Sequence, residues 1–114
     1  MQRRALRATV IGRIRDVRET GKSGLEAYLK KRVKELKGHH RKLSFPGHNG
    51  APDQLVRLKK WRRAKLVEVK KPNGRLEAHQ IREHERLIRD FKFEIAVVYT
   101  KEEVDVLLGC PALN

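Results

Sequence analysis

The pattern of hydrophobic and polar positions divides the chain into a short series of helices and strands. The clearest helix is predicted over residues 23–37, where apolar residues recur every three or four positions, at Leu25, Leu29, Val33 and Leu36. Ser23 and, three residues later, Glu26 match a capping box, and Gly38 is a typical C-terminal stop. We therefore expect this helix to begin at Ser23 and to end before Gly38.

Two short strands are expected next. The first spans residues 41–45, with Leu43 and Phe45 facing inward, and the second spans residues 54–58. The segment between them is rich in proline and glycine, which predicts a loop. After the second strand, residues 59–63 are expected to form a basic hairpin tip.

The remaining elements complete a mixed fold. A third strand opens at Leu66, and a helix follows from about Leu76 to Asp90. The run from Glu94 to Tyr99 is almost continuously apolar, which predicts a strand buried on both faces. Thr100 and Glu103 form a second capping box that opens a short C-terminal helix. This order of elements indicates an α/β fold with a small mixed sheet flanked by helices.

A basic N-terminal arm, residues 1–22, precedes this domain, which we take as residues 23–114. Six arginines and one lysine stand against Asp16 and Glu19, which gives the arm a net charge of +5. Its apolar residues fall at helical spacing, at Leu6, Val10, Ile14 and Val17, although Gly12 disfavours a helix. The arm is expected either to follow a DNA backbone or to pack as an added helix.

The charge of the whole chain points to a polyanionic partner. Its 114 residues hold 28 lysines and arginines against 14 acids, a net charge of +14, so nucleic acid is the first partner to expect. Cys110 is the single cysteine, which excludes an intrachain disulfide and fits a reducing compartment. The apolar runs are too short to span a membrane and no secretory signal is apparent, so a cytoplasmic protein is expected.

Three acids are candidates for one cation site: Glu26, Asp53 and Glu68. Asp53 opens one predicted strand and Glu68 stands near the end of the next, so an antiparallel hairpin brings both to the same sheet edge. Glu68 and Lys70 project from the same face of their strand, about 7 Å apart. Carboxylates suit a hard cation such as Mg²⁺, and a neighbouring lysine can hold an attacking water or the charge that develops on a phosphate.

Each of these residues also has a purely structural interpretation. Glu26 can serve as the capping partner of the helix, and Asp53 is a common turn residue after a proline. Glu68 and Lys70 match the solvated face of a half-exposed strand. The combined spacing is more specific than any single residue in it, and runs through Asp53, Glu68, Lys70 and Gln80.

Motifs along most of the chain, from about Gly24 to Leu108, combine into one pattern. They are Leu25-Glu26, Tyr28-Leu29, Arg32-Val33, Gly50-Ala51-Pro52-Asp53, Val67-Glu68-Val69-Lys70, Gly74-Arg75-Leu76, Gln80 and His84. This pattern resembles the VRR-NUC (virus-type replication-repair nuclease) family of the PD-(D/E)XK nuclease superfamily. The resemblance implies a metal-dependent endonuclease with a restriction-endonuclease-like αβββαβ core, which agrees with the predicted order of elements.

The resemblance also implies a role for each candidate residue. By the family pattern, Asp53 and Glu68 are ligands of Mg²⁺ or Mn²⁺, together with the backbone carbonyl of Val69. Glu26 is the acid contributed by the first helix, and Lys70 positions the attacking water.

Gln80 corresponds to the helix glutamine of the family, and three departures from the family pattern are present. Gln54 stands where an arginine often follows the Pro-Asp pair, and Glu77 stands where a serine or threonine often caps the helix. Residues 91–93 replace a glycine that commonly ends that helix. None of the three is an expected ligand, so they concern loop geometry and substrate fit.

Contacts with DNA are expected from the basic hairpin tip and its surroundings, at Lys59, Lys60, Arg62, Arg63 and Arg75. Trp61 in the same tip either stacks on a base or packs on a neighbouring subunit or the end of the sheet. His84, one turn after Gln80, either reaches a phosphate or lies on the helix surface. A zinc site is disfavoured because the other candidates lack paired spacing: His39, His40, His48 and Cys110.

The expected function is therefore a structure-selective DNA endonuclease that uses Mg²⁺ or Mn²⁺. The resemblance to stand-alone, often phage-encoded members implies a homodimer, a branched substrate such as a Holliday junction and, for a phage protein, the host cytoplasm. The alternative from composition alone is a non-catalytic basic nucleic-acid-binding protein, which gains nothing from carboxylates aimed at phosphate. A restriction-type endonuclease is a third interpretation, but 114 residues leave little room for a specificity element.

Overall fold

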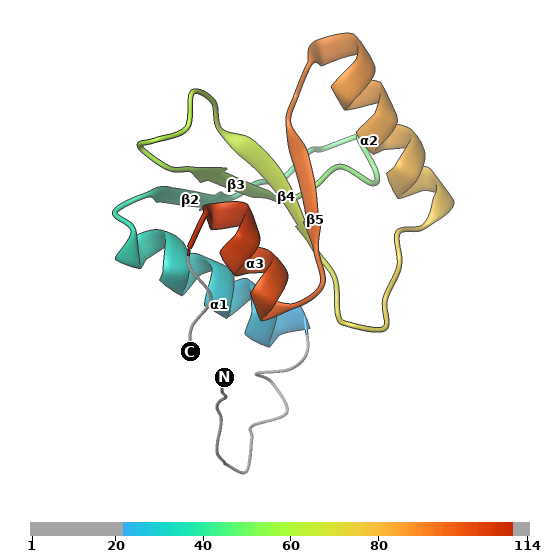
Figure 1. Ribbon diagram of the computed structural model, residues 1–114. Coiled ribbons are helices and arrows are strands. Elements are labelled where there is room, and N and C mark those ends of the chain that lie inside the picture. The colour runs from blue at the N-terminus through green and yellow to red at the C-terminus, as the bar shows by residue number, and fades with distance from the viewer. Residues whose placement is uncertain (1–21, 111–114) are drawn as a thin grey trace.

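A computed structural model describes residues 22–110 of the chain (Figure 1). Its elements are α1 (Lys22–Glu35), β2 (His39–Lys42), β3 (Gln54–Arg57), β4 (Lys65–Val69), α2 (Ala78–Phe91), β5 (Ile95–Val98) and α3 (Lys101–Leu108). The predicted αβββαβ core followed by a helix is confirmed. The helix proposed for the arm lies outside the described residues, and the boundary between arm and domain stays a prediction.

The four strands form one mixed sheet in the order β2-β3-β4-β5. The β2–β3 and β3–β4 pairs are antiparallel and the β4–β5 pair is parallel. The central strand β4 buries four of its five residues. The expectation that residues 94–99 are buried on both faces is wrong: β5 is an edge strand, and of its residues only Val98 is fully buried. The other three residues are half-buried, because β5 pairs with a neighbouring strand on one side alone.

Helices α1 and α3 lie side by side across one face of the sheet, while α2 stands apart from them beyond β5 (Figure 1). The apolar stripe of α1 fills the space between helix and sheet, as its spacing predicts. The core consists of Leu25, Leu29, Val33, Val56, Leu58, Val67, Val69, Val98, Val104 and Leu108. No helix of the described residues has both the length and the apolar character that crossing a membrane requires.

The ends of α1 differ from the prediction. Ser23 lies inside the helix rather than at its N-cap, so the expected capping box with Glu26 is absent. At the other end Lys37, not glycine, adopts the left-handed conformation, with a φ of 61°. The amides of Lys37 and Gly38 donate to the carbonyls of Lys34 and Val33, which is a Schellman arrangement. Gly38 is needed for another reason: a Cβ there would meet the Leu58 side chain at 2.7 Å.

The first strand also lies earlier than predicted, at residues 39–42 instead of 41–45. Its position is decided by the backbone register, which pairs His39 with Arg57 and Lys42 with Gln54. Leu43 and Phe45 are half-buried rather than inward-facing strand residues. An edge strand with mostly exposed side chains leaves no alternation of apolar residues for a sequence pattern to detect.

The two later helices begin largely as predicted. Thr100 caps α3, since its Oγ1 accepts a hydrogen bond from the amide of Glu103 at 3.1 Å. Glu103 returns the interaction by accepting from the amide of Tyr99 at 2.7 Å. At α2, Glu77 occupies the cap position and its amide donates to Oε1 of Gln80 at 2.9 Å.

A buried polar link joins α1 to α3. The Tyr28 hydroxyl donates to the Asp105 carboxylate at 2.9 and 3.0 Å, and Nε of Arg32 lies 3.3 Å from the same group. Burial and the hydrogen bond with Asp105 raise the pKa of the Tyr28 hydroxyl well above its usual range. Asp105 is only 8% exposed, so loss of its carboxylate would leave two partners without this acceptor.

We predict that Asp105→Ala lowers the free energy of unfolding by about 1–3 kcal/mol, because it leaves buried donors unpaired. Urea denaturation followed by circular dichroism measures this change. The control is Asp90→Ala, which removes an exposed acid paired only with its neighbour Arg89 and should change little. Equal stability of the two variants would contradict a structural role for Asp105.

Candidate active site

The two acids at the sheet edge are brought together by the β3–β4 pairing. The register pairs Gln54 with Val67 and Leu55 with Leu66. Continuing it by one residue places Asp53 and Glu68 at facing positions, as the predicted hairpin requires. The charge of Asp53 is felt at Glu68, where it raises the pKa of the carboxyl.

The helix acid reaches this edge through two polar side chains. Nε2 of Gln54 donates to Oε2 of Glu26 at 3.2 Å and to Oδ1 of Asp53 at 3.3 Å. Nζ of Lys42 lies 3.4 Å from a carboxylate oxygen of each acid. Glu26 therefore belongs to the acidic cluster, and the structural interpretation of it as a capping residue is wrong.

Lys42 and Gln54 are functional candidates that the sequence analysis did not select. Gln54 was noted as a departure from arginine, yet it is fully buried and also contacts Nε2 of His40 through its Oε1, at 2.7 Å. The burial of this glutamine marks it as a candidate, and burial can be seen only in the structure. Nothing in the sequence marks Lys42 as a candidate, because only the pairing of β2 with β3 brings it beside the two acids.

Glu68 of β4 and Lys70, the residue that follows this strand, lie on the same side, as predicted, but that side is not solvated. The side chains are 7% and 16% exposed, and Nζ of Lys70 lies 3.8 Å from Oε2 of Glu68. Gln80 of α2 connects the two: its Oε1 accepts from Lys70 at 2.9 Å and its Nε2 donates to Glu68 at 3.4 Å. The amide of Glu77 also donates to the same Oε1, which holds the glutamine in place.

His84 lies on the buried side of α2, against Glu68. Its Nε2 is 3.9 Å from Oε1 of Glu68 and is the one fully buried side-chain nitrogen or oxygen in residues 22–110 without a hydrogen-bond partner. Burial lowers the pKa of the imidazole and outweighs a backbone hydrogen bond with Gly50, which raises it. With only 5% of the residue exposed, His84 is placed to contact Glu68 rather than a phosphate.

The loop before β3 packs closely on the start of α2. Gly50 has a φ of 95°, and a Cβ there would lie 2.9 Å from the carbonyl oxygen of His79. Only glycine fits both the backbone conformation and the close approach. This contact fixes the loop that leads into Asp53 against the helix that carries Gln80.

The electrostatics of the cluster favour a cation. Burial raises the pKa of the Glu68 carboxyl, Lys70 lowers it, and the charges of Asp53 and Glu26 raise it again. These acids supply the oxygen ligands that Mg²⁺ and Mn²⁺ prefer, so the donor set fits such an ion. In residues 22–110 no three His, Cys, Asp or Glu side chains converge closely enough to form a complete metal-binding group, whether acidic or of the zinc type.

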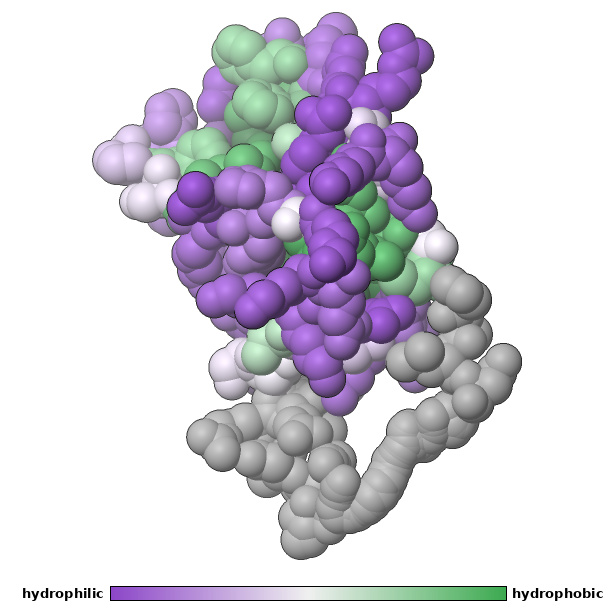
Figure 2. All heavy atoms as spheres, turned by 90° about the vertical axis from the view of Figure 1, so that its left-hand side faces the viewer, coloured by the Kyte–Doolittle hydropathy of each residue, from purple (hydrophilic) through white to green (hydrophobic). Residues whose placement is uncertain are grey.

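The predicted DNA-binding tip lies at the other end of the β3–β4 hairpin. The strand between them has about five residues, so roughly 17 Å separates the tip from the acids. Trp61 is half-buried against the core, with Nζ of Lys65 4.7 Å above its ring. The four cations around it are exposed, and much of the face shown in Figure 2 is hydrophilic. Arg75 is exposed on the loop between β4 and α2.

Comparison with known proteins identifies the family. No protein-family model and no curated protein matches the chain. A solved structure titled "VRR_NUC domain" is similar, with 39% sequence identity and a TM-score of 0.67. The match covers 77% of this chain and 94% of that chain. With this identity over nearly the whole of the solved domain, the chain belongs to the VRR-NUC family of PD-(D/E)XK nucleases.

Proposed function

We propose that this nuclease is a DNA endonuclease that depends on Mg²⁺ or Mn²⁺. The observation that supports it most directly is the arrangement at the sheet edge: Asp53 faces Glu68, and Lys70 and Gln80 are held against Glu68. A nucleophile, a phosphate and a cation must meet in such a reaction, and this cluster offers a partner for each.

The carboxylates of Asp53, Glu68 and Glu26, with the carbonyl of Val69, would hold the metal ion. When bound, the ion supplies a water of lowered pKa and polarises the scissile phosphate. The ammonium of Lys70 orients the attacking water and offsets the negative charge that develops on the phosphate. Because Lys70 has a flexible stem, the Oε1 of Gln80 restricts it to the side facing Glu68.

Lys42 has a separate task in this proposal. Its ammonium lies between Glu26 and Asp53, at 3.4 Å from each, and reduces the repulsion between the two carboxylates. The side chain is 57% exposed, so it would be free to move away from the two acids if a cation were bound there. It can then contact the bound phosphate backbone.

We also propose a branched DNA substrate and a homodimer. The chain has a net charge of +14, and residues 22–110 contain no recognised module that reads base edges, which favours recognition of shape and backbone. Two sites related by a two-fold axis match the symmetry of a four-way junction. The non-catalytic alternative is disfavoured because acids held beside one another, with Glu68 buried, cost stability, and a protein that only binds phosphate gains nothing from them.

Cleavage of a labelled four-way junction in Mg²⁺, Mn²⁺ or EDTA tests the proposal, with linear duplex of matched length as substrate control. Asp53→Ala and Lys70→Ala should each lower the cleavage rate by at least about a hundredfold, since the first removes a proposed metal ligand and the second removes the cation that offsets charge on the phosphate. Junction affinity should persist. Lys71→Ala, one residue further on and exposed, serves as the matched control and should cut normally.

Tight junction binding without cutting in either metal would favour the non-catalytic alternative. Equal cutting of junction and linear duplex would retain the nuclease and remove the branched-DNA proposal.

The role given to Gln80 leads to a second prediction. Gln80→Ala releases Lys70 and should lower the cleavage rate roughly 10- to 100-fold, the usual effect of losing a residue that orients a ligand. Junction affinity and unfolding midpoint should stay unchanged. Arg82→Ala, exposed on the same helix, is the control. A Gln80→Ala enzyme that cuts at the wild-type rate would show that Lys70 needs no such restraint.

The salt dependence of binding tests the hairpin tip. The logarithm of the association constant for DNA should fall linearly with the logarithm of salt concentration, by about 0.9 per phosphate contact. Changing both Lys59 and Arg62 to alanine should reduce the magnitude of this slope by the amount that corresponds to up to about two phosphate contacts. Lys30→Ala, on the exposed side of α1, is the comparison. An unchanged slope in the tip variant would place the DNA elsewhere.

A further inference from the structure

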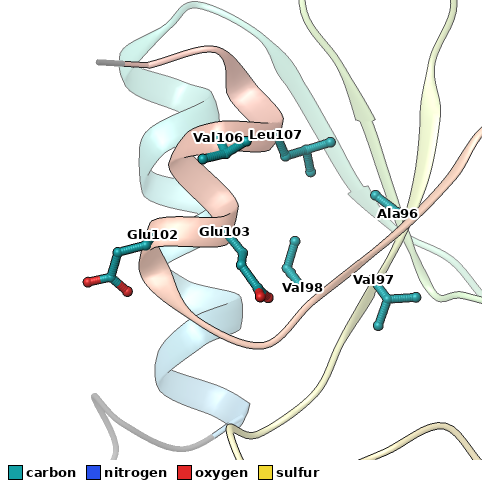
Figure 3. Close-up of a pocket in the computed structure, with 7 residues that line it drawn as sticks. All are labelled: Ala96, Val97, Val98, Glu102, Glu103, Val106 and Leu107. Carbon is teal, nitrogen blue, oxygen red and sulfur yellow. The ribbon is translucent and has the colours of Figure 1, made fainter. Parts of the chain in front are cut away.

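An apolar groove runs between β5 and α3 (Figure 3). Its volume is about 300 Å³. Its apolar lining consists of Ala96, Val97, Val98, Val106 and Leu107, and its acidic lining of Glu102 and Glu103. Val106 is 78% exposed, the largest exposure among the large apolar residues in the described part of the chain.

The groove does not suit DNA. Glu102 and Glu103 are exposed on the first turn of α3, where their charges repel phosphate. Helix α3 carries three acids and one lysine, a net charge of −2, in a chain of +14. An apolar floor beside acidic side chains is instead complementary to a segment that is both apolar and basic.

The N-terminal arm of this chain has that chemistry. Residues 1–21 hold six arginines and two acids, a net charge of +4. Their large apolar residues recur at helical spacing, at Leu6, Val10, Ile14 and Val17. A helix with this pattern presents an apolar stripe flanked by arginines.

The arm is also attached in the right place. It joins the chain at Lys22, where α1 begins, and the first turns of α1 lie beside the start of α3 (Figure 1). The contact is direct: Nζ of Lys101 lies 5.3 Å from the ring centre of Tyr28. Residues 18–21 span up to about 14 Å when extended, and residues 6–17 as a helix are about 18 Å long. Both lengths allow the arm to reach a groove lined by α3.

The volume of the groove limits how many apolar side chains of the arm it can hold. A cavity of about 150 Å³ holds one benzene molecule, so 300 Å³ has room for roughly two aliphatic side chains. Adjacent members of the stripe, such as Val10 and Ile14, fill this space together. An arm in this position also shields the free edge of β5 from pairing with another strand.

We propose that the groove between β5 and α3 receives the N-terminal arm of the same chain, with Val10 and Ile14 against the apolar floor and arginines beside Glu102 and Glu103. This docking is independent of the cleavage reaction. It covers Val106 and holds the basic arm along the edge of the sheet.

Two-dimensional amide NMR of the full-length chain tests the proposal. The variant Val10→Asp with Ile14→Asp should shift the signals of Val97, Val106 and Leu107, because it removes the docked side chains. The control Ala8→Asp with Gly12→Asp makes the same charge change on the opposite face of the arm helix, and should leave those signals in place. Groove signals that match wild type in both variants would overturn the proposal.

A variant of the groove and a cross-link complete the test. Val106→Lys alters an exposed position, so the fold tolerates it, and it should make the groove signals insensitive to the Val10→Asp and Ile14→Asp changes. Cysteines at positions 10 and 106, in a Cys110→Ser background, are treated with a short bismaleimide. A cross-linked monomer supports docking within one chain. Only cross-linked dimers would show that a second copy supplies the arm, and no cross-link would overturn the docking itself.

Discussion

Repulsion between carboxylates at the end of the β3–β4 hairpin is the constraint on which the site depends. The pairing of the two strands places Asp53 opposite Glu68, and Glu26 joins them from α1. Each acid is held by a polar neighbour that offsets the repulsion: Lys42 and Gln54 on one side, Lys70 and Gln80 on the other. Burial is the main cause of the raised pKa of Glu68, and the charges of Asp53 and Glu26 add to it. A divalent cation bound between the carboxylates would reduce their repulsion. Metal binding would therefore stabilise the same group of residues that the proposed reaction uses.

The fold separates the acids from the basic tip, which lie at opposite ends of the β3–β4 hairpin. Under the proposed function, a DNA backbone that contacts both runs along the sheet. Helices α1 and α3 are held together by polar contacts, since Tyr28 and Arg32 of α1 bind the buried Asp105 of α3. Helix α2 is different in kind: it contributes Gln80 and His84 to the site, although it packs little against the core.

The elements that could be predicted from the sequence are those marked by a local pattern of residues. The spacing of Leu25, Leu29 and Val33 located α1, and Thr100 with Glu103 located the start of α3. The exact ends of α1 and β2 were not predicted, because backbone conformation and strand pairing set them. Lys37 takes the left-handed position expected of glycine, and β2 begins two residues early because its pairing partner fixes it. Residues 95–99 are apolar, and both edge and central strands can have this composition, so composition could not distinguish the two positions.

By itself the sequence determined the order of elements and the family, and it selected Asp53, Glu68, Lys70 and Gln80, because spacing along strands and helices is a local property. Only the tertiary structure decided which residues surround these groups. It brought Lys42 to two acids across a strand pair, buried Gln54 between Glu26 and Asp53, and turned His84 toward Glu68. Such neighbours come from segments far apart in the chain, so their contacts depend on packing and register rather than on any local pattern.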